Sequence, residues 1–272
     1  RRADMGFEHI SSRRNKLIRE AAALAASAER RRGEARFLCE GARLCEDAAR
    51  SGVQIDRCFF TEQAQRRYGE YLNRILPAAQ EQFLVEEHVA DLLSSTRNSQ
   101  GIFCVCETPE NLKQGKQAFS GACAVLENLQ DPGNLGTVLR TAEALGIGCV
   151  FLLGDCCDPL SPKVLRASMG AVFRISVVAE TSPVRLRDLL KRRGYTLYAA
   201  VPDAAASPVT AIDFSEGLHA VLIGNEGNGL TKEAVALCDI RLTIPMAGRA
   251  ESLNASAAAT ILLWEMNRGA GY

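Results

Sequence analysis

Three short polar segments in the second half of this 272-residue chain could present hydrogen-bonding groups to a ligand. In the last of them, residues 244–248 read Ile-Pro-Met-Ala-Gly and residues 252–256 read Ser-Leu-Asn-Ala-Ser, directly before an apolar stretch that ends near Arg268. A proline-bearing loop that leads into a helix start with serine and asparagine directs backbone amides and short polar side chains outward. This segment is therefore predicted to contribute to a ligand site.

Two further segments have the same character. Residues 224–230 read Gly-Asn-Glu-Gly-Asn-Gly-Leu after an apolar run, and residues 128–136 precede a helical pattern that contains Arg140. Asn134 can cap that helix, and Arg140 then lies a turn or so further on, where its guanidinium can reach back to the site. Glu226 follows a strand in a glycine-rich bend, where it could fix the loop through backbone amides or accept a proton.

The glycine-rich segment does not match two common phosphate-binding patterns. It lacks Gly-Lys-Ser/Thr, and the first basic residue after its glycines is Lys232. The order Gly224-x-x-Gly227-x-Gly229 also reverses the spacing of the dinucleotide fingerprint. A nucleotide-phosphate cradle and a dinucleotide site are therefore both disfavoured.

Taken in this order and at this spacing, the three segments resemble the three motifs of the SpoU (TrmH-like) RNA ribose 2'-O-methyltransferases, a family of the SPOUT superfamily. The resemblance covers roughly residues 120–268, and three ordered motifs are far more specific than any one of them. It implies S-adenosylmethionine as methyl donor, an RNA partner with rRNA slightly preferred to tRNA, and a homodimer. Because the donor methyl must lie in line with the ribose oxygen, much of such catalysis is positioning.

The resemblance also implies roles for single residues. Arg140 matches an arginine with a catalytic role in the family. Because a guanidinium is not deprotonated in an ordinary protein setting, we expect Arg140 to bind the phosphate of the target nucleotide and to polarise the 2'-hydroxyl. A role of Arg140 as general base stays open. At each of the other matching positions, the residue type could also be explained by an ordinary structural role in a turn, in the core or at a helix cap. The predicted catalytic residues are Arg140, Asn134, Glu226, Ser252 and Asn254, and the predicted cofactor-binding residues are Gly224, Ile244, Met246 and Leu253.

Basic residues are concentrated near the start of the chain. The net charge is zero, so an RNA contact requires a local patch. Residues 1–36 hold ten Lys or Arg residues against five Asp or Glu residues, although such a run is about as often a solvated helix face. The predicted RNA-binding residues are Arg13, Arg14, Lys16 and Arg249, with Arg166 as a further candidate.

Composition favours a soluble globular protein, with 47% hydrophobic and 24% charged residues. Most of the ten cysteines lie in apolar runs, where reduced thiols act as small core residues, and this favours the cytoplasm. A metal site is not expected, because there is no CxxC pair and the three histidines lie away from the cysteines. A membrane partner is not expected either, because no apolar stretch reaches the ~18 residues needed to span a bilayer.

The first half, residues 1–107, reads as a small α/β domain. Its predicted elements are a helix over 15–32, strands over 35–41, 53–60 and 100–106, and a helix over 42–51. Residues 37–41 and 99–103 resemble the ribosomal-protein-like RNA substrate-binding domain of many SpoU enzymes, although Lys16 stands where proline is common there. A plain packing domain stays an alternative. Residues 108–119 are polar and lack apolar periodicity, so they are predicted to be a linker.

Residues 120–272 alternate between strand and helix, which predicts an α/β fold with a mostly parallel sheet and helices on both faces. Strands are expected at 122–126, 149–153, 173–178, 196–201, 220–223 and 240–244, and helices at 134–145, 162–169, 183–193, 231–238 and from 254 to about 268. All three motifs then follow strand ends, where such sheets bind ligands. General topology rules favour an unknotted chain, whereas the resemblance implies a C-terminal trefoil knot that forms the cofactor pocket, with the site at a subunit boundary.

Two other classes of function stay open. A non-catalytic RNA-binding protein would be expected to have lost some of Arg140, Glu226, Ser252 and Asn254. A methyltransferase of another fold, acting on a protein or a small molecule, would be expected to carry a glycine-rich motif early in its catalytic domain. This chain has Asp-Pro-Gly-Asn at residues 131–134 instead.

Overall fold

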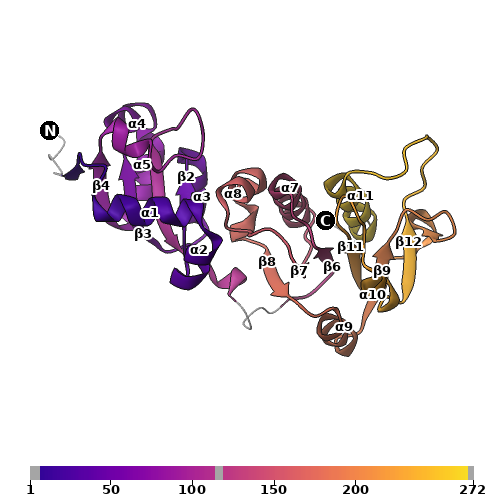
Figure 1. Cartoon of the computed structure of the whole chain (residues 1–272). Coiled ribbons are helices and arrows are strands. Elements are labelled where there is room, and N and C mark those ends of the chain that lie inside the picture. Colours follow the sequence, from indigo (N-terminus) through magenta and orange to yellow (C-terminus); the bar gives the residue numbers. More distant parts are fainter. Residues whose placement is uncertain (1–6, 114–118, 269–272) are drawn as a thin grey trace. The chain divides into compact units, whose positions relative to one another are not determined.

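The computed structural model describes residues 7–113 and 119–268 and divides the chain into two compact units (Figure 1). The first unit is Arg1–Pro109 with Leu160–Arg166, and the second is Glu110–Pro159 with Ala167–Tyr272. The division after Pro109 falls inside the segment expected to be a linker. Arg1, Arg2 and Asp4, three of the charged residues counted over residues 1–36, lie outside the described residues.

The first unit contains a mixed five-stranded sheet in the order β1-β4-β3-β5-β2. β1 and β3 pair with β4 in parallel, whereas β2 and β3 pair with β5 in antiparallel fashion. The strands are β1 (Glu8–Ile10), β2 (Arg36–Glu40), β3 (Ile55–Phe60), β4 (Ala79–Val85) and β5 (Ile102–Glu107). The helices are α1 (Lys16–Ala26), α2 (Ala28–Glu34), α3 (Ala42–Arg50), α4 (Glu62–Arg67), α5 (Gly69–Ile75) and α6 (Glu87–Ala90).

The prediction of a single helix over residues 15–32 is wrong, because the helix is interrupted at Ser27. Ser27 has an extended backbone (φ −128°, ψ 121°), and its hydroxyl accepts a hydrogen bond from the Arg30 amide, which caps α2. The Arg31 guanidinium donates to the carbonyls of Leu24 and Ala25 at 2.7 and 3.1 Å, which satisfies the end of α1. Arg31 is therefore a buried structural residue and not part of a basic surface.

α1 supports the sheet of the first unit through one apolar stripe. Ile18, Ala21 and Leu24 recur at helical spacing and are buried against a core that includes Phe59 and Phe103. Asn15 caps this helix by accepting from the Leu17 amide at 2.8 Å. Lys16 is then the first helical residue, a position where proline is also well tolerated, so this departure from the family pattern is compatible with the same helix start.

The second unit contains a seven-stranded sheet in the order β10-β12-β9-β11-β6-β7-β8, in which every pair is parallel. The strands are β6 (Cys123–Glu127), β7 (Cys149–Leu153), β8 (Ser176–Glu180), β9 (Tyr195–Ala200), β10 (Ser207–Pro208), β11 (Leu218–Ile223) and β12 (Ile240–Thr243). The helices are α7 (Pro132–Ala144), α9 (Pro183–Arg192), α10 (Lys232–Ala236) and α11 (Ala255–Asn267), whereas α8 (Pro162–Ser168) lies mostly in the first unit.

Helices cover both faces of this sheet, as the alternation predicts. Figure 1 shows α7 and α11 on one face and α9 and α10 on the other. β6 and β7 are buried along their whole length, so they read as continuous apolar runs. The strand expected over 173–178 is partly wrong: residues 171–173 form a 3-10 turn, and the strand starts only at Ser176.

All ten cysteines are free thiols, and seven of them are buried. Burial raises the pKa of Cys123 to about 11 and that of Cys238 to about 12. These thiols are therefore protonated at neutral pH and pack as small apolar side chains.

Within residues 7–113 and 119–268, no helix combines the length and the apolar character that a membrane crossing requires.

Candidate active site

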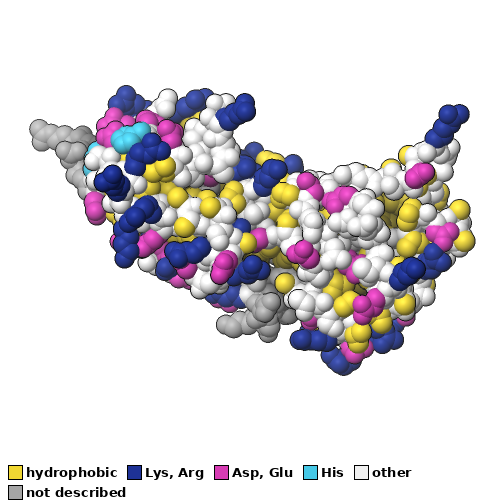
Figure 2. Space-filling view, in the orientation of Figure 1, with side chains coloured by type: hydrophobic (Ala, Val, Ile, Leu, Met, Phe, Trp, Pro, Cys, Tyr) yellow, Lys and Arg dark blue, Asp and Glu magenta, His cyan; other side chains and the backbone are white. Residues whose placement is uncertain are grey.

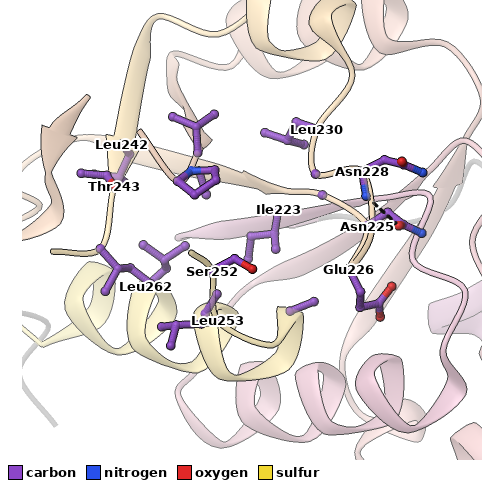
Figure 3. A pocket seen from close by; sticks show the side chains of 18 of the residues that line it. Ile223, Asn225, Glu226, Asn228, Leu230, Leu242, Thr243, Ser252, Leu253 and Leu262 are labelled. Carbon is purple, nitrogen blue, oxygen red and sulfur yellow. Dashed lines mark hydrogen bonds between the residues drawn. The ribbon is translucent and has the colours of Figure 1, made fainter. Parts of the chain in front are cut away.

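A cavity of about 360 Å³ opens at the carboxyl edge of the parallel sheet, where the segments after β11, β9 and β12 meet the start of α11 (Figure 3). All four predicted cofactor-binding residues line it: Gly224, Ile244, Met246 and Leu253. Glu226 and Ser252, from the predicted catalytic set, line it as well. Arg140, Asn134 and Asn254 are not among the lining residues.

The glycine-rich segment forms one wall of the cavity as a tight hairpin. The amide of Asn225 donates to the Gly229 carbonyl at 3.2 Å, and the Gly229 amide donates back at 2.9 Å. A Cβ atom on Gly224 would lie only 2.1 Å from the backbone carbon of Gly229. A side chain at Gly224 would therefore force the hairpin open, so glycine is required at this position.

Apolar and polar groups divide the rest of the lining between them. Ile223, Leu242 and Leu262 supply apolar surface from β11, β12 and α11. In Figure 3, Ser252 and Leu253 lie on the side of the cavity formed by the start of α11. A cavity of this size and mixed character suits a small molecule with an apolar body and a few polar groups.

A chain of three polar side chains joins the three motifs beside this cavity. The Asn134 amide nitrogen donates to the Glu226 carboxylate at 2.6 Å. The Asn254 amide nitrogen in turn donates to the Asn134 side-chain oxygen at 3.1 Å. Segments 92 and 120 residues away from Asn134 in the sequence are therefore held together through this one side chain.

The cap of α7 differs from the expectation. Asp131 is the N-cap residue, because its carboxylate accepts from the Asn134 amide at 2.8 Å and Pro132 occupies the first helical position. The expected capping role of Asn134, and the helix start at this residue, are therefore wrong. Since Asp131 provides the cap, the Asn134 side chain remains available for Glu226.

Asn254 caps α11, which agrees with one of the two roles considered for it. Its side-chain oxygen accepts from the amides of Ser256 and Ala257 at 2.9 and 3.3 Å. The same side chain uses its amide nitrogen to contact Asn134, so capping and site assembly are compatible. Ser252 does not cap the helix, and it lies in the loop before it.

Arg140 lies on α7, six residues beyond Asn134, which corresponds to about 9 Å along a helix axis. Its side chain is exposed. Within the part of the chain that the structure describes, it has no hydrogen-bond or ion-pair partner. An unpaired, exposed guanidinium on the helix that carries Asn134 is free to bind an anionic group of a substrate.

The four residues predicted to bind RNA are exposed, whereas the further candidate is not. Arg13 and Arg14 form the turn before α1, and the Lys16 side chain is 83% exposed. Arg249 lies in the exposed loop between β12 and α11, whereas Arg166 is half-buried. Figure 2 shows Lys and Arg side chains mixed with Asp and Glu on the visible face, so exposure alone does not single out one basic surface.

Several residues that build the site were not identified from the sequence. The cavity also receives Ala200, Val201 and Pro202 from the end of β9, which is adjacent to β11 in the sheet. Their position after a parallel strand was the available signal, since such ends share one edge. Among the described residues, no group of three or more His, Cys, Asp or Glu side chains is arranged to hold a metal ion.

A parallel sheet with helices on both faces and a cavity at its carboxyl edge is typical of α/β proteins that bind small molecules. The SpoU rRNA Methylase family model matches residues 121–264, and the MRM3-like substrate binding domain model matches residues 15–104. The chain therefore belongs to the SpoU methylase family.

Three similar proteins illustrate this membership. The chain is 33% identical to the uncharacterized tRNA/rRNA methyltransferase slr1673 of Synechocystis sp., over 95% of this chain and 93% of that protein. It is 30% identical to the 23S rRNA (guanosine(2553)-2'-O)-methyltransferase RlmP of Bacillus subtilis, over 96% and 99%. The SpoU methyltransferase AviRb of Streptomyces viridochromogenes, solved with the cofactor AdoMet, superposes with a TM-score of 0.83 at 27% identity, over 94% of this chain and 98% of that one.

Proposed function

We propose that this protein transfers a methyl group from S-adenosylmethionine to the 2'-hydroxyl of a ribose in RNA, with rRNA preferred to tRNA. The observation that carries the proposal is the hydrogen-bonded chain Glu226–Asn134–Asn254 beside the cavity, because it joins all three motifs into one site. The 2'-O specificity and the rRNA preference are supported by the similarity to RlmP, whose name states both.

The cavity fits the proposed methyl donor. Its volume of about 360 Å³ lies in the range of roughly 300–1,000 Å³ for small-molecule sites. Gly224, Ile244, Met246 and Leu253 would hold the donor between the hairpin, the end of β12 and the start of α11, with peptide groups as hydrogen-bonding partners. When bound, S-adenosylmethionine supplies an electrophilic methyl group on a sulfonium centre.

Two side chains have complementary tasks toward the ribose in this proposal. Arg140 binds the phosphate of the target nucleotide and polarises the 2'-hydroxyl, since a guanidinium stays protonated at neutral pH. Glu226 is the only ionisable side chain among the described residues that line the cavity. Its carboxylate therefore accepts the proton of that hydroxyl in this proposal. The new carbon–oxygen bond then forms as the carbon–sulfur bond breaks, and Glu226 later releases its proton to water.

Asn134, Asn254 and Ser252 support this chemistry. Asn134 holds the Glu226 carboxylate through its amide nitrogen at 2.6 Å. Asn254 in turn fixes the Asn134 side chain, because the first amides of α11 anchor Asn254 itself. Ser252 places a hydroxyl in the cavity lining, where it can reach the donor or the ribose.

The organisation of the whole protein is also proposed. Residues 1–107 would bind the RNA substrate through Arg13, Arg14 and Lys16, and residues 120–272 would carry the methyltransferase site, with Arg249 as a further RNA contact and 108–119 as linker. We infer a C-terminal trefoil knot and a cytoplasmic homodimer from family membership. The exposed side chains of Ile261 and Trp264 on α11 support the dimer, since large exposed apolar groups on one helix face are typical of an interface.

Mapping of 2'-O-methylated nucleotides in total RNA tests the function in the cell. We expect a strain that lacks this protein to lose methylation at one rRNA nucleotide, and a plasmid copy of the gene to restore it. A copy with Glu226→Gln should not restore it. A complete and unchanged methylation map in the deletion strain would contradict the proposal.

A further inference from the structure

Two consecutive residues at the end of β6, Glu127 and Asn128, hold both ends of the glycine-rich hairpin. Neither residue lines the cavity. Glu127 contacts Thr231 at the end of the hairpin, 104 residues further along the chain, and Asn128 contacts Asn225 at its start, 97 residues further along. The two contacts are possible because β6 and β11 are parallel neighbours that end at the same edge.

Asn225 ties the start of the hairpin in two directions at once. Its side-chain oxygen accepts from the amides of Gly227 and Asn228 at 2.8 and 3.3 Å, which folds the turn (Figure 3). Its amide nitrogen donates to the Asn128 carbonyl at 2.9 Å. One side chain therefore sets both the shape of the hairpin and its position relative to β6.

Glu127 holds the end of the hairpin with a buried carboxylate. The Thr231 amide donates to one carboxylate oxygen at 2.8 Å, and the Thr231 hydroxyl donates to the other at 2.7 Å. The same hydroxyl accepts from the Ala234 amide at 3.1 Å and so caps α10. Glu127 is only 3% exposed, so its carboxylate needs both of these hydrogen bonds to offset the loss of water.

Asn128 is fixed in a conformation that is uncommon for a residue with a side chain. Its φ is +53°, and its side-chain oxygen accepts from the Asp155 amide at 2.8 Å. The Asn128 amide donates to the Leu153 carbonyl at 3.0 Å. These hydrogen bonds stabilise the left-handed backbone of Asn128. In this conformation the Asn128 carbonyl accepts the hydrogen bond from the Asn225 side chain.

We infer that Glu127, Asn128, Asn225 and Thr231 form a clamp that preorganises the glycine-rich hairpin for the methyl donor. The inference rests on the proposed function. Glu127, Asn128 and Thr231 do not line the cavity and act on the donor through the hairpin, whereas Asn225 also lines the cavity. The clamp also links the two halves of the site, because the segment after Asn128 carries Asn134, which holds Glu226 within the same hairpin. Loss of the clamp should therefore have a larger effect on the free energy of donor binding than on the free energy of unfolding.

Calorimetric titration of the full-length protein with S-adenosylmethionine tests this clamp, with the thermal midpoint measured in parallel. Asn225→Asp keeps the oxygen that folds the turn but sets a carboxylate oxygen against the Asn128 carbonyl. Thr231→Val removes the hydroxyl, whereas Thr231→Ser retains it. Ser182→Ala is the matched control, because it removes the side-chain cap of α9 in the same unit, away from the hairpin.

We expect Asn225→Asp and Thr231→Val to raise the dissociation constant of the donor by roughly 10-fold or more, the effect of losing a partly buried hydrogen bond that positions the site. Thr231→Ser should bind within about 2-fold of the wild type, and Ser182→Ala should lower the thermal midpoint with unchanged donor binding. Wild-type affinity in both clamp variants, with a lowered midpoint only, would overturn the clamp. Absence of donor binding by the wild type would instead overturn the proposed function, and the role of the clamp with it.

Discussion

Asn134 is the residue on which the geometry of the site depends, and the orientation of its amide follows from its neighbours. Two helix amides donate to the Asn254 side-chain oxygen, so the Asn254 amide nitrogen must face outward toward Asn134. Asn134 then has to present its oxygen to Asn254 and its nitrogen to Glu226. The start of α11 thereby determines which group meets the carboxylate.

Glu226→Gln separates the two roles that the sequence leaves open for this residue. A glutamine can still accept from the Asn134 amide nitrogen, so a purely structural role predicts almost normal activity. If Glu226 takes the proton of the hydroxyl, we expect methyl transfer to fall by ~100-fold or more, with unchanged donor affinity. Single-turnover transfer measured alongside donor titration distinguishes the two roles.

Arg140→Ala tests the proposed electrostatic contact to the nucleotide. We expect folding and donor affinity to be nearly unchanged and methyl transfer to fall by ~100-fold or more, because one preorganised charged group is lost. Arg140→Lys should restore little, since a point charge does not reproduce a planar two-pronged contact. Arg192→Ala, an exposed arginine at the end of α9, is the matched control and should retain normal activity. Normal turnover by Arg140→Ala would contradict the mechanism but not the fold.

At the scale of elements, the loop over residues 94–96 is held to β2 by one carboxylate. Glu40 accepts from the hydroxyls of Ser94 and Thr96 and from both the amide and the hydroxyl of Ser95. Burial alone would raise the pKa of Glu40, but these hydrogen bonds outweigh it and the pKa lies below its ordinary value. The ionised form of Glu40 therefore stabilises the folded state.

This lowered pKa predicts a pH-dependent contribution to stability. Because the folded pKa is below the unfolded one, the contribution is fully present above the unfolded value, near 4.5, and is lost as pH falls through the folded value. We expect Glu40→Gln to lower the melting temperature at pH 7, and the difference from wild type to shrink below about pH 4. Glu62→Gln, an exposed carboxylate on α4, serves as control and should show a smaller difference at pH 7. Equal melting temperatures at pH 7 for wild type and Glu40→Gln would rule out this contribution.

The elements of the second unit were largely predictable because their signals are local. Buried parallel strands such as β6 and β7 are continuous apolar runs, and the three polar segments mark the strand ends. The predicted helix boundaries are wrong where a nearby polar residue caps a helix. Ser27 divides one expected helix in the first unit, and Asp131 caps α7 in place of Asn134. Residues 61–99 gave no prediction, although they form β4, α4, α5 and α6, because these elements are short and largely polar.

The contacts that assemble the site could not be predicted from spacing. The bond between Glu127 and Thr231 spans 104 residues, and the bond between Asn134 and Asn254 spans 120. Their formation depends on which strands become neighbours, and the strand order of the sheet is not contained in the periodicity of any one segment. The family resemblance supplied part of this information, since it associates the three motifs with one site.

At the scale of the whole molecule, we propose that the first unit binds the RNA. Combined substitution of Arg13, Arg14 and Lys16 by alanine removes three exposed cations near the start of the described chain. We expect weaker RNA binding, a shallower dependence of affinity on salt, and unchanged donor affinity, because fewer counterions are released on binding. Filter binding at several salt concentrations measures this. An unchanged salt slope would remove these residues from the RNA interface.

The position of the transferred methyl group tests the central claim most directly. Purified protein is incubated with labelled S-adenosylmethionine and rRNA from the deletion strain, and the RNA is digested to nucleosides that are identified by mass spectrometry. We predict that the label appears in one 2'-O-methylated nucleoside and that Glu226→Gln lowers its amount by ~100-fold or more. Label on a nucleobase, on the protein itself, or on no product at all would contradict the assignment of this chain as an RNA ribose 2'-O-methyltransferase.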